Sequence, residues 1–384
     1  MEARDVTMET YIEMTPRLIE VNVRRYHDLT DRLVSLFRSR GASEIRIVAS
    51  GSSHNSSVMA RPCMEHLLGM RVCVLTPARY LEELEQLDVI APQAFEVFIS
   101  QSGCSTNIIE AVRAARAAGH PTVALTGNVQ AALCDEVDEA IEYGVGNETV
   151  DFVTLGVGTL VQFLVMFALG AAEATGKIDA ARREDWLAQI SATAGLNREM
   201  RLRTLELMDA RERSLLAPGP VFMCGTGPTY GLALEGALKW EETLKAPAMP
   251  WECEEYIHGP NMQLTPASIA VFLDADHRPG RTYDTYLATR EVTDRAYLFA
   301  AYPDPKGGAD ANMVGLDGSA VHRLLAPLYL LPSVQLLSAH AMIALDCEET
   351  HPLFKRFERH VNSKTADYDE VMRRKREQLE ASGA

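Results

Sequence analysis

Three residues in the stretch LALEGALKWEETLK, residues 232–245, could move protons. Glu235, Lys239 and Glu242 stand at i, i+4 and i+7, so a helix would place all three on one face. A carboxylate in such a group can act as the general base toward a proton on carbon. The same spacing is typical of a solvated helix face, and the residues alone leave both interpretations open.

A histidine that could serve as the matching acid follows in PWECEEYIHGP, residues 250–260. Gly259 and Pro260 predict a tight turn directly after His258. A glutamate base with a nearby histidine acid is the pair that proton shuttling at carbon requires. A lone histidine in a turn is more often structural, so a structural role stays an alternative.

Two serine-rich stretches, FISQSGCSTN and GSSHNSS, each end a predicted strand and open a predicted helix. Backbone N–H groups at a helix start, together with hydroxyls, can bind an anion without a lysine. Both stretches fall at the carboxyl edge of one sheet, where ligands of open α/β folds bind. The alternative is an ordinary serine-rich N-cap. The candidate anion-binding residues are Ser52, Ser53, Ser100, Gln101, Ser102 and Ser105.

Neither serine stretch matches the glycine-rich patterns that cradle nucleotides, which disfavours nucleotide binding. The second half of the chain has no such serine loop, because the equivalent strand there runs into LDADHRPGRT. We therefore expect one phosphate-type site per chain.

The elements that position these residues begin at Ile45, where short apolar runs start to alternate with helical patterns. This alternation predicts an α/β fold, with parallel sheets flanked by helices on both faces. Each half opens with a strand, a glycine-bearing loop and a helix start, which indicates duplication. The expected strands are 45–50, 71–76, 95–100, 121–127 and 139–144 in the first half, and 221–225, 268–275, 295–301 and 321–327 in the second.

A charged helical stretch and a Pro-Gly-Pro break divide the two halves. The predicted organisation is an N-terminal segment (1–30), a first domain (31–178), a linker helix with the second domain (179–345), and a C-terminal tail (346–384).

The net charge of −16 argues against a nucleic-acid surface, because counterion release needs clustered Lys and Arg. An anionic small molecule must then be held by local donors. Seven scattered cysteines without CxxC spacing suggest neither a disulfide framework nor a zinc site. The N-terminus carries no signal-peptide pattern, so we expect a cytoplasmic protein.

One segment, 152–172, is uncharged over a length that could cross a bilayer, and it is the only such segment that the sequence suggests. Its threonines, glutamine and glycines, and flanks without clustered Lys or Arg, favour a helix buried between subdomains or subunits. A membrane span is the alternative, and we expect no membrane partner.

In combination, the paired loops, SQSG, LALEGALK, the downstream glutamate and HGP resemble the sugar isomerase (SIS) domain family. Over roughly residues 45–364 the pattern is similar to the isomerase half of glucosamine-6-phosphate synthase and to the fructosamine and glucoselysine-6-phosphate deglycases. The resemblance implies two flavodoxin-like SIS subdomains, each with a five-stranded parallel sheet. It also implies a homodimer or higher even assembly, and no cofactor.

The resemblance gives the candidate residues roles. The serine loops match the family's phosphate site, Glu242 matches its base, and Glu235 and Lys239 match helix residues near the reacting carbons. His258 matches the ring-opening histidine, which in the family enters the site of a neighbouring subunit.

The chain also departs from the synthase pattern. Where the family reads E…STK, this chain keeps Glu148 and Thr154 but lacks the lysine. Lys364 matches a lysine near the synthase C-terminus, in a tail that differs and extends further. No glutaminase domain precedes the pair in this sequence, so we expect no synthase activity.

The expected function is a deglycase that cleaves a 6-phosphorylated sugar–amino acid conjugate, such as fructoselysine 6-phosphate or glucoselysine 6-phosphate, through an enolamine. A glucosamine-6-phosphate deaminase or an aldose–ketose isomerase is the alternative within the family. A non-catalytic sugar-phosphate sensor is the alternative from another class. The sequence does not indicate which amino acid is released.

Overall fold

The computed structural model describes residues 7–347 and 351–381 of the chain. These residues cluster into two compact units, each described by itself. Within the described residues, the first-sheet unit comprises 21–57, 63–185 and 351–381. The second-sheet unit comprises 7–20, 58–62 and 186–347. The domain boundaries expected from the sequence stay a prediction.

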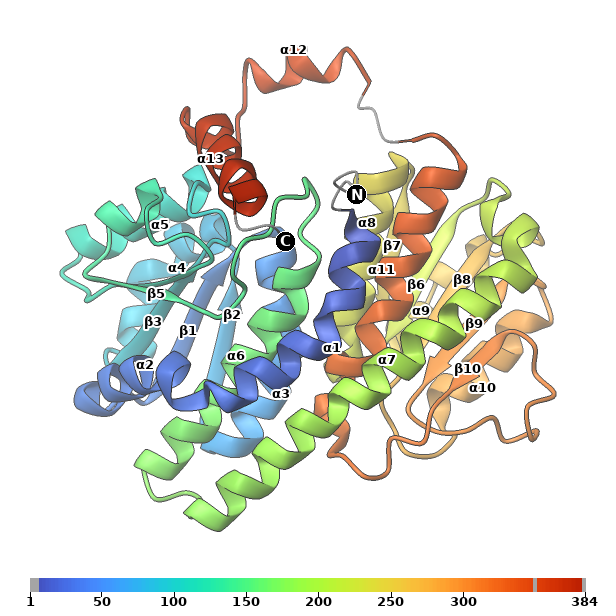
Figure 1. Cartoon of the computed structure of the whole chain (residues 1–384), viewed down its shortest axis with the longest axis horizontal. Helices are drawn as coiled ribbons and strands as arrows, with labels where there is room; N and C mark the ends of the chain where they lie inside the picture. Colours follow the sequence, from blue (N-terminus) through green and yellow to red (C-terminus); the bar gives the residue numbers. More distant parts are fainter. Residues whose placement is uncertain (1–6, 348–350, 382–384) are drawn as a thin grey trace. The chain divides into compact units, whose positions relative to one another are not determined.

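The first-sheet unit is built on five parallel strands in the order β2-β1-β3-β4-β5, which is the flavodoxin order (Figure 1). All six residues of β1 are buried, as expected of a strand covered on both faces. The strands are β1 (Glu44–Ala49), β2 (Arg71–Leu75), β3 (Ala94–Ile99), β4 (Val123–Thr126) and β5 (Glu139–Glu142).

Helices cover both faces of this sheet. On one face Phe98 of β3 packs with Tyr80 and Ile108, which belong to two different helices. On the other face the ring of Phe95 contacts the rings of Phe37 and Phe167. The helices of this part of the chain are α2 (Tyr26–Arg40), α3 (Gly51–Leu68), α4 (Pro77–Ile90), α5 (Thr106–Ala117), η1 (Ala132–Asp135), α6 (Leu155–Ala174), α12 (Phe354–Glu358) and α13 (Tyr368–Ala381).

The second-sheet unit repeats this topology. Its five parallel strands have the order β7-β6-β8-β9-β10, which is the first order with each strand replaced by its counterpart. The strands are β6 (Val221–Gly225), β7 (Ala248–Glu252), β8 (Ile269–Asp274), β9 (Ala296–Ala300) and β10 (Met313–Gly315). The α/β fold class, with two flavodoxin-like units, is confirmed.

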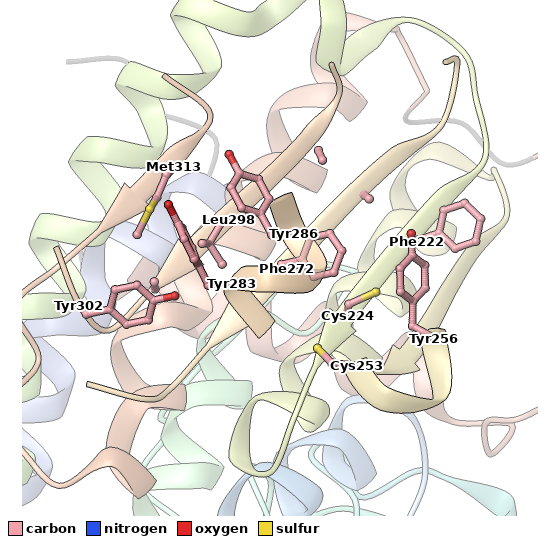
Figure 2. Packing of buried hydrophobic residues seen from close by; sticks show 13 residues of the cluster. Phe222, Cys224, Cys253, Tyr256, Phe272, Tyr283, Tyr286, Leu298, Tyr302 and Met313 are labelled. Carbon is pink, nitrogen blue, oxygen red and sulfur yellow. The ribbon is translucent and has the colours of Figure 1, made fainter. Parts of the chain in front are cut away.

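An aromatic cluster fills one face of the second sheet. Figure 2 shows Phe222 and Phe272 of the strands against Tyr256, Tyr283 and Tyr286 of the covering segments. On the other face two helices pack so closely that a Cβ added to Gly236 would lie 3.0 Å from Val334. The remaining helices are α1 (Met8–Arg24), α7 (Ala180–Leu216), α8 (Pro228–Leu244), α9 (Cys253–Tyr256), η2 (Pro260–Gln263), α10 (Arg281–Arg290), η3 (Arg323–Leu325) and α11 (Ala326–Ala344).

Two expectations for the second sheet are wrong. The fifth strand is β10, whereas 321–327 forms η3 and the first turn of α11. Strand β7 is absent from the expected strands, since Pro247 precedes it and Pro250 lies within it, and proline is disfavoured in strands. The sheet order places β7 at an edge, where a proline is tolerated because one side of the strand needs no ladder hydrogen bonds.

Among the residues that the structure describes, two helices are long and apolar enough to cross a membrane, Leu155–Ala174 and Arg323–Ala344. The sequence suggested only the first, because Arg323 and interspersed polar residues conceal the second. In the most apolar 18-residue stretch of each helix, all residues of the first helix and 94% of those of the second are buried. Burial to this extent is typical of the core helices of a soluble protein.

Candidate functional site

The serine loops of the first-sheet unit lie together at the carboxyl ends of β1 and β3, which pair directly. The side chain of Asn107 donates a hydrogen bond to Ser50 Oγ at 2.9 Å, which links the two loops. Ser52 lies in the first turn of α3 and is 7% exposed. Ser100 is 3% exposed, and its hydroxyl donates to Ser105 Oγ at 2.9 Å. The predicted juxtaposition of the two loops is therefore present.

A glycine is required at the last position of SQSG, residue 103. Gly103 has a φ of 70°, and a Cβ at this position would lie 2.4 Å from the Cβ of Ala131. The N–H of Gly103 donates to Ser100 O at 3.0 Å, and its carbonyl accepts from the N–H of Leu133 at 2.9 Å. These bonds fix the loop in a turn that leaves Ser102 partly exposed.

Glu148 is a buried cap for helix α6. Its carboxylate accepts N–H bonds from Thr154 and Leu155, both at 2.7 Å, and from Gly156 at 3.0 Å. It also accepts a short hydrogen bond from the amide of Gln101. A carboxylate suits this place because the N-terminus of a helix carries partial positive charge. Glu148 therefore orients Gln101, with all four of its bonds made inside the protein.

Lys364 reaches the serine loop from the C-terminal segment. It forms an antiparallel bridge with Ser105, and its ammonium donates to Ser102 Oγ at 3.4 Å. The neighbouring N–H of Thr106 donates to Ser363 O at 3.1 Å. The segment thus pairs with the loop through its backbone and places a cation beside the predicted anion site.

In the second-sheet unit, the glutamate and lysine stripe lies on α8 as predicted, but it is not solvated. Glu235 and Lys239 are fully buried, whereas the side chain of Glu242 is 31% exposed. The ammonium of Lys239 lies 3.5 Å from Glu235 Oε1 and makes a short contact with Glu242 Oε2. Burial lowers the pKa of Lys239, but the two carboxylates outweigh burial and raise it overall. The lysine is therefore charged, and its ammonium holds the partly exposed side chain of Glu242 in position.

His258 is exposed in the predicted turn. Its N–H donates to Glu255 O at 3.1 Å, and Gly259 follows with a φ of 145°. Within the described residues of this unit, no hydrogen bond or ion pair joins the His258 ring to Glu242. The serine loops belong to the other unit, so the structure groups the predicted residues into a serine site, an α8 stripe and a separate histidine.

The carboxyl edge of the second sheet carries a buried acid at the position where the first sheet carries Ser100. Asp274 ends β8, is 4% exposed, and accepts from the hydroxyl of Tyr302 at 3.0 Å. Burial raises the pKa of Asp274 to about 6, although bonds from Tyr302 and the N–H of Asp276 oppose the shift. An ionised acid here repels anions, which supports the expectation of a single phosphate-type site.

A third cluster lies at the amino-terminal edge of the first sheet. Ligand atoms of Asp88, Glu96 and His120 lie within 4.8 Å of one another, a spacing that could hold a metal ion. The buried guanidinium of Arg46 already donates to Asp88 at 3.1 Å and to Glu96 at 3.0 Å. His120 lies 3.0 Å from Glu96 and 3.1 Å from Asp88. A cation already occupies the place between the carboxylates, so this group is an ion-pair network.

Ser50, Asn107 and Lys375 are site residues that the sequence prediction omits. Asn107 could have been found from its place in FISQSGCSTN. Lys375 lies in the C-terminal helix, and nothing in the local pattern signals its position near the loop after β4.

The chain is similar in sequence to glutamine–fructose-6-phosphate aminotransferases. It is 26% identical to the enzyme of Bartonella quintana over 354 residues, covering 88% of this chain and 56% of that enzyme. It is 26% identical to the enzyme of Methanosarcina mazei over 316 residues, covering 81% of this chain and 50% of that enzyme. The chain spans about half the length of these curated relatives. No protein-family model matches the chain.

Solved structures share the fold over most of the chain. A candidate phosphosugar isomerase from Clostridium difficile aligns with a TM-score of 0.83 and 20% identity, covering 94% of this chain and 99% of that one. The C-terminal domain of the aminotransferase from Francisella tularensis aligns with a TM-score of 0.76 and 21% identity, covering 91% and 99%. Glucosamine-6-phosphate deaminase from Thermotoga maritima aligns with a TM-score of 0.66 and 16% identity, covering 88% and 96%. The chain therefore has the fold of these structures, two α/β units of the SIS type, and it is similar in sequence to glutamine–fructose-6-phosphate aminotransferases.

Proposed function

We propose that this chain is a phosphosugar enzyme that cleaves a 6-phosphorylated sugar–amino acid conjugate, such as fructoselysine 6-phosphate or glucoselysine 6-phosphate. The products would be the sugar phosphate and the free amino acid. The observation that carries this proposal is the buried Lys239 of α8, which contacts the partly exposed side chain of Glu242 and holds it in position. Proton transfer at carbon requires a base held in this manner.

In the proposed reaction, Glu242 removes a proton from one of the two carbons nearest the nitrogen and returns it to the other. Loss of the first proton gives an enolamine, and protonation of the other carbon converts the carbon–nitrogen single bond to the double bond of an imine. Water then adds to the imine carbon. Collapse of that adduct releases the amino acid as the amine and leaves a carbonyl on the sugar. His258 would supply the proton exchange that opens the sugar ring before these steps.

The serine loops would hold the phosphate. Their hydroxyls and helix N-termini are suited to an anion, and Lys364 adds a positive charge beside Ser102. Binding energy from the phosphate, which is remote from the reacting carbons, would orient those carbons toward the base. Glu148 would contribute indirectly, through Gln101.

A deaminase or an aldose–ketose isomerase is the second candidate. It is favoured by the fold shared with glucosamine-6-phosphate deaminase and uses the same base, but releases ammonia or nothing. A non-catalytic sensor needs no carboxylate fixed by a buried lysine, so the α8 stripe disfavours it.

We also propose a cytoplasmic homodimer or larger homo-oligomer with shared active sites.

The test is incubation with a panel of 6-phosphorylated glycated amino acids and with glucosamine 6-phosphate. Sugar phosphate, free amino acid and ammonia are assayed separately, with the Glu242→Gln variant as the background. We expect equal amounts of sugar phosphate and amino acid from at least one conjugate. Ammonia from glucosamine 6-phosphate, with every conjugate left intact, would establish the deaminase instead.

A further inference from the structure

Lys375 is a buried lysine that the proposed reaction does not use. It lies in α13 and is 9% exposed. Its carbonyl accepts a hydrogen bond from the side chain of Asn147 at 2.6 Å, which anchors the helix. Its ammonium donates to Gly127 O at 3.4 Å. The C-terminal segment therefore carries this ammonium to the loop that follows β4.

The ammonium of Lys375 has more donors than partners. A lysine offers three N–H donors, and within residues 7–347 and 351–381 the ammonium makes the single, long bond to Gly127. Glu148, the carboxylate that contributes most to raising the pKa of Lys375, already accepts four hydrogen bonds from other donors. Burial lowers the pKa of Lys375, and Glu148 and Glu142 oppose that shift only in part. A buried cation without a close anion is costly, which points to a missing partner.

Lys375 and the serine loops lie at the same edge of the first sheet, but beside the ends of different strands. The serine loops follow β1 and β3, whereas Gly127 follows β4 and Glu148 follows β5. All four strands are parallel, so these loops share the carboxyl edge where ligands of this fold bind. The N–H of Gly127 donates to Gln101 O at 3.0 Å, which joins the Lys375 region to the serine loop. Figure 1 shows α13 over this end of the first-sheet unit.

We propose that Lys375 forms a second anion subsite, which binds a carboxylate of the substrate while the serine loops bind its phosphate. The inference rests on the proposed function and deepens it, because a 6-phosphorylated sugar joined to an amino acid carries these two anions at opposite ends. Glucosamine 6-phosphate and simple sugar phosphates lack the carboxylate. The subsite would therefore favour a glycated amino acid that keeps its α-carboxylate free.

The experiment compares two ligands that differ by one carboxylate. Fructosylglycine 6-phosphate carries it, and fructosylmethylamine 6-phosphate has a hydrogen in its place. Binding of each is measured by calorimetry to wild type, Lys375→Met and Lys375→Arg. The matched control is Lys355→Met, which removes an exposed lysine from α12 of the same segment.

Lys375→Met should weaken binding of the carboxylate ligand at least about tenfold and leave the methylamine ligand within about twofold, since a lost charge-assisted bond affects one ligand only. Lys375→Arg should keep most of the preference for the carboxylate ligand over the methylamine ligand, and Lys355→Met should keep all of that preference. Equal weakening of both ligands, or no preference in wild type, would overturn the subsite. Lys375→Gln replaces the Met variant if thermal melting shows that the latter is unfolded.

Binding and turnover answer separate questions. A Lys375-dependent preference without any cleavage of the conjugate would keep the subsite and reject the deglycase. Cleavage of the conjugate with a preference that survives in Lys375→Met would keep the deglycase and reject the subsite.

Discussion

At the scale of single residues, burial is what separates Glu242 from an ordinary surface glutamate. Its neighbour on α8, Glu241, is exposed, whereas Glu242 contacts the buried ammonium of Lys239. The lysine is itself balanced by Glu235, so the group has one cation and two carboxylates. Removing this group from water strengthens its electrostatic interactions, and the only member with exposed side-chain surface is the proposed base.

Glu242→Gln should lower the cleavage rate at least about a hundredfold while substrate binding is kept. Glutamine has nearly the same shape but cannot accept the proton, so the loss should appear in kcat rather than in KM. The control is Glu241→Gln, which neutralises the exposed neighbour and should retain wild-type kinetics. Full activity in Glu242→Gln would reject this residue as the base.

Asp274 should make stability depend on pH. Its pKa is raised from 3.8 to about 6 by burial, so the folded chain holds this proton more tightly than the unfolded chain. Ionisation between about pH 4 and 6 therefore costs stability as pH rises, by about 3 kcal/mol in total. In Asp274→Asn this contribution is absent, so the variant should gain stability over wild type as pH rises from 4 to 7.

The measurement for Asp274 is the urea midpoint of both proteins across that pH range. Other carboxylates titrate in wild type and variant alike, so the difference between the two curves isolates this residue. A difference that stays constant with pH would show that Asp274 ionises normally in the folded chain.

At the scale of elements, the serine site depends on two strand-to-helix loops and one returning segment. The loops could be predicted because their hydroxyls follow directly after apolar strands, and parallel strands end at one edge. The hydrogen bond from Gln101 to Glu148 and the position of Lys375 near Gly127 could not be predicted, because each depends on a contact between distant segments. Strand β7 could not be predicted from the local sequence either, because its proline disfavours a strand in the interior of a sheet. The proline is tolerated because β7 lies at the edge, and only the sheet order shows that.

Ser100→Ala with Ser102→Ala should weaken phosphate-ester binding. Each hydroxyl lost from a charged ligand is worth about 1 to 3 kcal/mol, so the double variant should bind glucose 6-phosphate at least about tenfold less tightly. Calorimetry with glucose 6-phosphate measures this, and Ser39→Ala on the exposed part of α2 is the control. Unchanged affinity in the double variant would place the phosphate elsewhere.

At the scale of the whole molecule, the two units share one sheet topology but differ in the residues at the carboxyl edges of their sheets. The first sheet ends in hydroxyls and the second in a buried acid, Asp274. In a chain of net charge −16, this division matters because anions are attracted only where local donors gather. Specialisation of one edge explains why a duplicated fold would keep a single phosphate site.

Within the described residues, His258 makes no hydrogen bond or ion pair with the proposed base, and it lies on an exposed turn. Met262, a few residues further along the same turn, is 87% exposed. We propose that this turn enters the site of a second copy. Glu242→Gln and His258→Asn should each be inactive alone, and mixing them under subunit exchange should restore part of the activity. Some mixed sites would then carry both wild-type groups.

The control for the mixing experiment is each variant exchanged with itself, which should stay inactive. Sedimentation under assay conditions should show at least a dimer of the 42.3 kDa chain. Inactive variants that never complement would leave Glu242 as the base but reject the shared site, because every mixed assembly would then contain only sites damaged in one residue or the other. A fully active monomer would reject the assembly altogether, and His258 would then have to act on substrate bound by its own chain.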